Sequence, residues 1–141
     1  MSGPTLEQLE GVCWGEPEFG SHLVVTCHRL RKKPVDEFSV EDFRMMIGQS
    51  IGLPHLLPRA AIVLEADPLA EGDYYPGDLL SAVLHADRSP LCERPELLQR
   101  IIAVTDHAEK RIAVEAEANP RSAEAKLLRE IQQFRSELDA K

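Results

Sequence analysis

Residues 71–80 read Glu-Gly-Asp-Tyr-Tyr-Pro-Gly-Asp-Leu-Leu, and this stretch separates two apolar, helix-like segments. Gly72 and Gly77 can adopt backbone angles that other residues avoid, and Pro76 fixes its own φ angle. Asp78 stands directly before two leucines, where its carboxylate can cap a helix. The stretch therefore predicts a shaped turn between two helices. Because Gly, Pro and Asp also gather in ordinary helix connections, a turn with only a structural role stays an alternative.

The sequence around this turn is acidic. No Lys or Arg occurs between Arg59 and Arg88, whereas the interval holds six carboxylates. They are Glu65, Asp67, Glu71, Asp73, Asp78 and Asp87. An acidic turn with two tyrosines on a rigid frame is typical of a surface that docks onto a basic protein. With one aspartate assigned to the helix cap, the candidate binding residues are Asp67, Glu71, Asp73, Tyr74 and Tyr75.

Apolar residues recur with the helical period along most of the chain. Thr5, Ser39 and Ser122 are typical helix start signals, and Gly11 is a typical stop signal. The periodic segments are residues 6–9, 23–30, 40–47, 53–64, 80–84, 97–108 and 127–138. Residues 61–64 are the nearest candidate for a strand, but they lie inside a helical period. The sequence predicts an all-α fold, a single-domain irregular bundle of about five to seven helices.

Several helix ends follow from Gly and Pro. Gly52 is expected to end the third helix, and the next helix is expected to begin between Pro54 and Pro58, because N–H groups in a first turn lack partners anyway. The short helix after the acidic turn is expected to end near Ser89-Pro90. The four basic residues within 29–33 are expected at the C-terminal end of the second helix, where cations complement the macrodipole.

Charge and length limit the classes of function. The 141 residues include 24 acidic and 16 basic side chains, a formal net charge of −8, which argues against nucleic acid as a direct ligand. Residues 1–92 carry a net charge of −7 and residues 93–141 of −1. We expect one domain over residues 1–141, with a less firmly packed helix in 110–141, because that region is charge-rich. No apolar run approaches the roughly 20 residues needed to cross a bilayer.

The sequence shows no visible machinery for catalysis or for metal or cofactor binding. Its five histidines are scattered, and its glycines do not have the spacing of a phosphate-binding loop. Cys13, Cys27 and Cys92 lack the paired spacing of zinc or redox motifs, so we expect reduced, buried thiols in a cytoplasmic protein. Trp14, the only tryptophan, is expected to fill a gap in the core. We therefore predict a protein that is not an enzyme and has no catalytic residue, metal or cofactor.

Four motifs follow one another along residues 44–80. They are Arg-Met-Met-Ile-Gly-Gln at 44–49, Gly-Leu-Pro-His-Leu-Leu-Pro-Arg-Ala at 52–60, Leu-Glu-Ala-Asp-Pro-Leu at 64–69 and Gly-Asp-Tyr-Tyr-Pro-Gly-Asp-Leu-Leu at 72–80. This succession resembles the contact-dependent growth inhibition (CDI) immunity proteins of Gram-negative bacteria, over roughly residues 5–105. The chain departs from that family at 61–62 and 91–92, and residues beyond about 110 have no clear counterpart.

The resemblance implies a small cytoplasmic protein that neutralises the toxic C-terminal domain of a large secreted surface protein. Such toxins are commonly nucleases, and an acidic helical protein fits a basic substrate groove. The expected partner is this cognate toxin domain, with no direct contact to nucleic acid or membrane; the oligomeric state is left open. The alternatives are a non-catalytic helical adaptor or regulatory subunit, which would self-associate through its last helix, and an RNA-processing enzyme.

Overall fold

Helix follows helix in the computed structural model, which describes residues 3–12 and 22–139. Eight α-helices, one short 3-10 helix and no strand occur over these residues. They are α1 (Leu6–Glu10), α2 (His22–Arg31), η1 (Val35–Glu37), α3 (Val40–Gly48), α4 (Leu53–Ala66), α5 (Asp78–His85), α6 (Ser89–Cys92), α7 (Pro95–Ala118) and α8 (Ala123–Asp139). The all-α prediction is confirmed. The structure adds the single turn α6 to the seven helices that the periodicity predicts.

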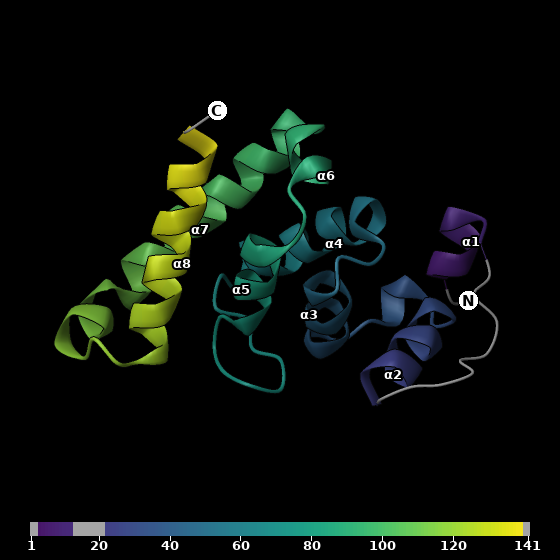
Figure 1. The fold of residues 1–141 in the computed structure, drawn as a ribbon, viewed down its shortest axis with the longest axis horizontal. Helices are drawn as coiled ribbons and strands as arrows, with labels where there is room; N and C mark the ends of the chain where they lie inside the picture. Colours follow the sequence, from purple (N-terminus) through teal and green to yellow (C-terminus); the bar gives the residue numbers. More distant parts are fainter. Residues whose placement is uncertain (1–2, 13–21, 140–141) are drawn as a thin grey trace.

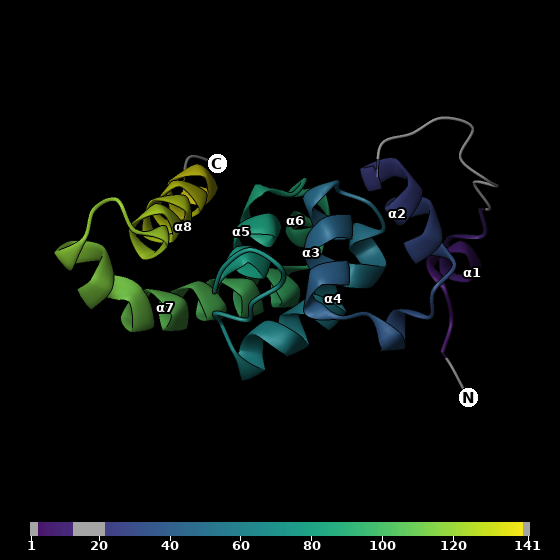
Figure 2. The same ribbon diagram turned by 90° about the horizontal axis from the view of Figure 1, so that it is seen from below.

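The helices form an elongated arrangement with the acidic turn near its middle. Figures 1 and 2 show α1 and α2 at one end, the α7–α8 hairpin at the other, and α3, α4 and α5 between them. The principal contacts are α3 with α5, α4 with α7, and α7 with α8, while α5 also contacts α8. One continuous cluster of buried apolar side chains runs from Leu6 in α1 to Phe134 in α8. No helix among the described residues is both long enough and apolar enough to span a bilayer.

Helix caps agree closely with the sequence. The Oγ1 atom of Thr5 accepts a hydrogen bond from the Gln8 amide at 3.2 Å, and the Gln8 side chain accepts one from the Thr5 amide, which completes a capping box. Ser39 and Asp42 repeat this arrangement at the start of α3. Gly11, with a φ of 71°, ends α1 in the left-handed conformation. These predictions are confirmed because capping depends on residues close in sequence.

The predicted boundary between the third and fourth helices is wrong in two details. Helix α3 ends at Gly48, and Gly52 instead precedes α4 as its N-cap residue. Helix α4 begins before Pro54, so Pro58 lies inside it. Pro54 stands in the first turn, where an N–H group has no intrahelical acceptor. Pro58 removes one backbone hydrogen bond, and the deeply buried apolar face of α4 offsets that loss.

The predicted end of the helix after the acidic turn is also wrong. Helix α5 ends at His85, and Ser89-Pro90 begins α6 instead. The Oδ1 atom of Asp87 accepts a hydrogen bond from the Ser89 amide at 3.1 Å, which stabilises the first residue of α6. Proline at the beginning of a helix has no N–H group to leave unsatisfied. The same dipeptide can therefore start a helix as readily as it can stop one.

Helix α2 ends in basic residues as predicted, but Arg31 is buried, with a side chain only 2% exposed. Its guanidinium pairs with Glu10 and donates to the Val12 carbonyl at 2.6 Å, so it ties α2 to α1. Leu23, the first residue of the predicted apolar period 23–30, is 36% exposed. The reason is that the buried residues of α2 begin at Thr26, so its first turn lies outside the core.

Two of the three cysteines lie in the described residues, and both are free thiols. Cys27 is buried as expected, and burial raises the pKa of its thiol. Cys92 is exposed, which contradicts the prediction of a buried thiol, because the short helix α6 buries only Leu91. Cys13 and Trp14 fall outside the described residues.

Helix α8 buries one face against α7 and α5. Leu127, Ile131 and Phe134 are each at most 1% exposed, and Ser122 starts the helix by accepting a hydrogen bond from the Ala125 amide at 3.1 Å. The prediction of a single domain with a less firmly packed helix in 110–141 stays a prediction.

Removing the aromatic ring of Phe134 tests how firmly α8 belongs to the core. We expect Phe134→Ala to lower the free energy of unfolding by about 3–5 kcal/mol, measured by urea denaturation, because it leaves a cavity between helices. Gln132→Ala, an exposed neighbour, should change it by about 0.5 kcal/mol or less. An early transition confined to residues 110–141, seen by hydrogen exchange, would instead support the less firmly packed helix.

Candidate functional site

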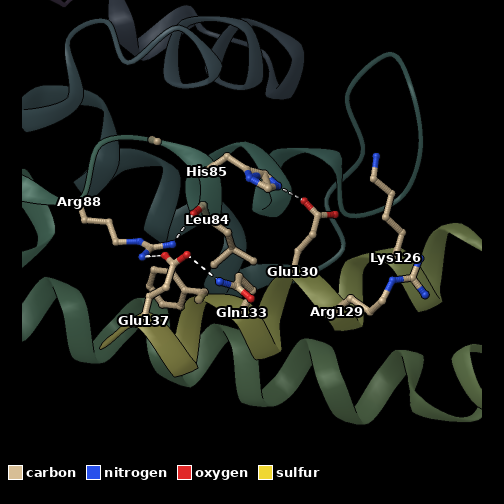
Figure 3. A pocket seen from close by; sticks show the side chains of 10 residues that line it. Leu84, His85, Arg88, Lys126, Arg129, Glu130, Gln133 and Glu137 are labelled. Atoms are coloured by element: carbon tan, nitrogen blue, oxygen red, sulfur yellow. Dashed lines mark hydrogen bonds and ion pairs between the residues drawn. The ribbon is translucent and has the colours of Figure 1, made fainter. Parts of the chain in front are cut away.

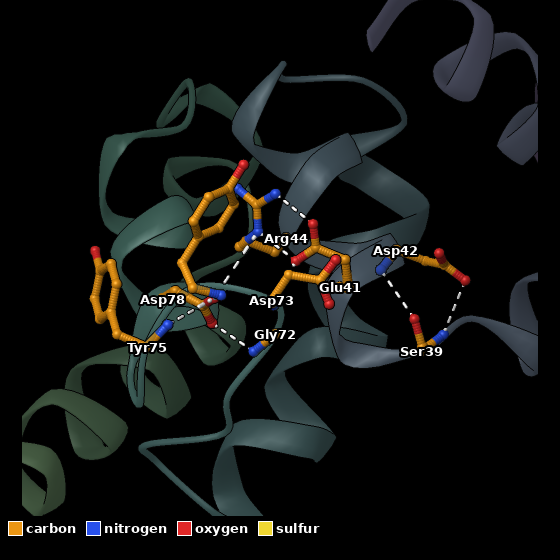
Figure 4. Close-up of polar contacts among 9 residues, drawn as sticks. Ser39, Glu41, Asp42, Arg44, Gly72, Asp73, Tyr75 and Asp78 are labelled. Atoms are coloured by element: carbon orange, nitrogen blue, oxygen red, sulfur yellow. Dashed lines mark hydrogen bonds and ion pairs between the residues drawn. The ribbon is translucent and has the colours of Figure 1, made fainter. Parts of the chain in front are cut away.

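The loop between α4 and α5 folds around the carboxylate of Asp78 (Figure 4). Asp78 is 3% exposed and accepts hydrogen bonds from the amides of Gly72 at 2.7 Å and Tyr74 at 3.1 Å. The Tyr75 amide makes a longer contact of 3.5 Å. The predicted N-cap role of Asp78 is therefore wrong. Gly77 occupies the N-cap position, and Asp78 is the first helical residue, with its side chain turned back into the loop.

Both glycines of the turn have close neighbours, and the backbone angle of Gly77 favours glycine. Gly77 has a φ of 93°, and an added Cβ would lie 2.6 Å from a methyl group of Leu127 in α8. An added Cβ on Gly72 would lie 2.6 Å from a carboxylate oxygen of Glu41 in α3. Distances below about 3 Å force neighbouring atoms to move, and a positive φ is strained for residues other than glycine. The backbone of the turn therefore packs closely against α3 at Gly72 and against α8 at Gly77.

Helix α3 holds the turn through an ion pair. Nε and Nη2 of Arg44 each donate to one carboxylate oxygen of Glu41 at 2.5 Å, which is a bidentate pair. One of those oxygens also accepts a hydrogen bond from the Asp73 amide at 2.9 Å. Arg44 lies 3.9 Å from a carboxylate oxygen of Asp78. The hydrogen bond from Arg44 is the main reason that the pKa of Glu41 lies below its usual value.

The two tyrosines of the turn have different neighbours. The Tyr74 residue is 69% exposed, and its ring lies under the guanidinium of Arg44, with Cζ 4.4 Å from the ring centroid. Tyr75 is half-buried, and Nζ of Lys126 in α8 lies 5.9 Å from its ring centroid. Both contacts have cation–π geometry. Tyr74 therefore faces the α3 side of the turn, whereas Tyr75 faces α8.

Arginines from α7 neutralise part of the acidic interval. Arg100 makes a bidentate pair with Glu65, and this hydrogen bonding lowers the pKa of Glu65. Arg111 donates to Asp67 at 2.9 Å, and the same carboxylate oxygen accepts from the Leu69 amide at 3.1 Å. The interval 60–87 contains no Lys or Arg of its own, but two of its carboxylates form ion pairs with arginines of α7, which is distant in sequence. Within the described residues, neither Glu71 nor Asp73 forms an ion pair, and both are exposed.

The structure brings four of the five predicted binding residues into one turn and leaves the fifth apart. Glu71, Asp73, Tyr74 and Tyr75 lie within the loop that Asp78 organises. Asp67 lies at the end of α4, where it is occupied by Arg111 and by the backbone.

Sequence reasoning missed two residues that hold the turn. Glu41 and Arg44 stand three positions apart on α3, a spacing at which opposite charges meet on a helix. This spacing could have indicated the pair, although not its contact with the turn.

A hollow of about 590 Å³ lies between α5 and α8 (Figure 3). Its polar groups largely satisfy one another: His85 and the hydroxyl of Ser81 both contact one oxygen of Glu130, and Arg88 pairs with Glu137. The other oxygen of Glu130 is buried without a hydrogen-bond partner. The described part of the chain holds no group of side chains suited to a metal ion. The polar contacts around the hollow mainly hold α8 against α5 and the residues that follow it.

A family model described as CDI immunity proteins matches residues 8–101. Because this match covers more than half of the chain, the protein belongs to the CDI immunity protein family, and the resemblance drawn from the sequence is confirmed. No curated protein matches the chain. The matched region runs from α1 into α7 and includes Glu41, Arg44 and the whole turn. Helix α8, which packs against the turn through Leu127, lies outside it.

Removing the carboxylate of Asp78 should cost more than the loss of a helix cap. We expect Asp78→Ala to lower the free energy of unfolding by about 2–4 kcal/mol, because buried amides of the turn lose a charged acceptor. Asp73→Ala, which removes an exposed carboxylate from the same turn, should change it by about 0.5 kcal/mol or less. Urea denaturation of both variants measures the difference. A loss near 1 kcal/mol for Asp78→Ala would indicate a simple cap instead.

Acid should weaken the clamp between α3 and the turn. The folded pKa of Glu41 lies below its unfolded value, so the stabilisation is present above the unfolded pKa of about 4.3 and is lost as pH falls through the folded pKa. We expect Glu41→Gln to be less stable than the wild type at pH 7, with the difference shrinking below about pH 4. Urea denaturation across this range measures it. Glu37→Gln, at an exposed position, is the control. If the stability of both variants relative to the wild type does not change with pH, the ion pair of Glu41 does not stabilise the turn.

Proposed function

We propose that this protein neutralises the cognate toxin domain of a large secreted surface protein by stoichiometric binding. The observation that carries the proposal is the family match over residues 8–101, since CDI immunity proteins protect cells through recognition of a toxin. The protein would act in the cytoplasm, where a delivered toxin domain meets its target. It would have no enzymatic activity of its own, which fits a site built from backbone amides, paired carboxylates and aromatic rings.

A basic nuclease is the kind of toxin that the charge of this protein fits best. The net charge of −8 favours association with a basic surface, and the carboxylates of Glu71 and Asp73 are exposed without an ion pair inside the described chain. A nuclease offers such a surface, because its substrate groove binds phosphate. Binding there would place an acidic protein across the path of the nucleic acid.

The proposed contact residues are Asp67, Glu71, Asp73, Tyr74 and Tyr75. Glu71 and Asp73 would pair with basic groups of the toxin, and Tyr74 would supply a fixed aromatic anchor. Tyr75 would contribute from the side of α8. Asp67 already pairs with Arg111, so it would have to share or exchange that partner on binding.

Reversing the charge of the turn tests this proposal. We expect Glu71→Lys and Asp73→Lys each to weaken binding to the linked toxin domain by about 2–5 kcal/mol, because each places a cation against a basic partner. The stability of either variant should change by about 0.5 kcal/mol or less, since both side chains are exposed. Calorimetric titration with a catalytically inactive toxin domain measures the affinity, and co-expression with the active toxin measures protection.

Glu117→Lys makes the same change of charge at an exposed position near the end of α7 and serves as the matched control. Its affinity should stay close to that of the wild type. Raising the salt concentration should slow association of the wild type more than association of the two turn variants, because salt screens long-range steering. Unchanged affinity in both turn variants would contradict the acidic contact, whereas a wild-type protein that neither binds nor protects would overturn the proposed function itself.

A further inference from the structure

A shallow groove of about 310 Å³ lies beside the acidic turn, between the start of α2 and helix α3. We call it the Tyr74 groove; its lining includes Leu23, Arg44, Met45, Gln49 and Tyr74. This volume stands at the lower end of the range of small-ligand pockets, about 300–1,000 Å³. It suits one side chain of a partner better than a separate small molecule.

Tyr74 is fixed in place although it is largely exposed. Its backbone amide donates to the buried carboxylate of Asp78, and its ring stacks on the guanidinium of Arg44. Arg44 is in turn fixed by its bidentate pair with Glu41. An aromatic ring that is already ordered loses little conformational entropy when a partner packs on it. Exposed and ordered aromatic rings of this kind are typical anchors of protein interfaces.

The remaining lining of the groove is mixed, with apolar Leu23 and Met45 beside polar His22 and Gln49. Leu23 is 36% exposed and stands in the exposed first turn of α2, together with Val24 and Val25. Met45 is half-buried, and its flexible thioether side chain adapts to different shapes. The charge of Arg44 is already compensated by Glu41, so it does not repel a basic partner strongly. The groove therefore offers apolar contact next to the ring of Tyr74.

The margin of the Tyr74 groove is acidic. Asp73 precedes Tyr74 in the chain and is exposed, and Glu71 lies two residues earlier in the same turn. An apolar centre with a charged rim is the usual anatomy of a protein interface. Exposed apolar side chains also occur far from the groove: Val114, 80% exposed, lies near the end of α7, at the opposite end of the molecule from α2 (Figure 1). Such single exposed residues are ordinary on protein surfaces.

We infer that the Tyr74 groove receives an apolar side chain of the toxin domain, flanked there by Lys or Arg residues that pair with Asp73 and Glu71. This inference rests on the proposed function and adds Leu23, Met45 and Gln49 to the residues that decide which toxin is recognised. The acidic margin favours a basic surface on the partner. The fixed ring and the apolar lining supply contact area that charge alone does not.

Titration calorimetry of an inactive toxin domain into the purified protein tests the inference. Tyr74→Ala and Leu23→Asp are each expected to raise the dissociation constant at least about thirtyfold, the effect of losing an interface anchor. Tyr74→Phe keeps the ring and should bind within about threefold of the wild type. Val114→Asp, a matched change at the far end of α7, should bind within about twofold. Thermal melts of all four variants confirm that the folded proteins are compared.

Three outcomes would overturn the inference, and they can be told apart. If Tyr74→Ala and Leu23→Asp bind as the wild type does while the lysine variants of the turn still weaken binding, the groove is not a contact but the proposed function stands. If the wild type neither binds nor protects against the toxin, both fail. If sedimentation shows that the free protein forms dimers that Tyr74→Ala dissociates, the groove holds a second copy of this chain and not a toxin side chain.

Discussion

The acidic turn depends on one buried carboxylate. Asp78 is 3% exposed, and a charge in that position is tolerated only when donors surround it. The amides of residues 72, 74 and 75 supply them, and Arg44 lies close by. The loop therefore has to wrap around the start of α5 in one conformation. This conformation places Asp73 and Tyr74 beside α3, where Glu41 and Arg44 add further contacts.

The distribution of charge on the surface is set by which arginines can reach which carboxylates. Helix α7 passes close to the end of α4, so Glu65 and Asp67 are matched by Arg100 and Arg111. Residues 71–74 do not pair with the arginines of that helix, and Arg44 of α3 already forms an ion pair with Glu41. Of the acids in this interval, Glu71 and Asp73 in the loop and Asp87 after α5 are left exposed without an ion pair among the described residues.

Much of the fold could be predicted because helix periodicity and capping are local. Thr5, Ser39 and Ser122 mark helix starts that depend only on residues three positions away. The role of Asp78 could not be predicted in this way, because an aspartate at that position can cap a helix or bind a loop, and tertiary contacts decide between them. The buried Arg31 and the Glu41–Arg44 clamp were missed for the same reason. The turn was found from its composition, whereas the groove beside it required the three-dimensional arrangement.

The turn keeps its shape through backbone amides and through side chains that belong to other elements. Asp78 and Glu41 bind the N–H groups of residues 72–75, and none of these hydrogen bonds involves the side chain of residue 71, 73 or 74. The outward-facing side chains are therefore free to change during evolution without loss of the loop conformation. A lineage that meets a new toxin can alter recognition by a few surface substitutions, and a protein engineer can use the same loop as a scaffold for variable contacts.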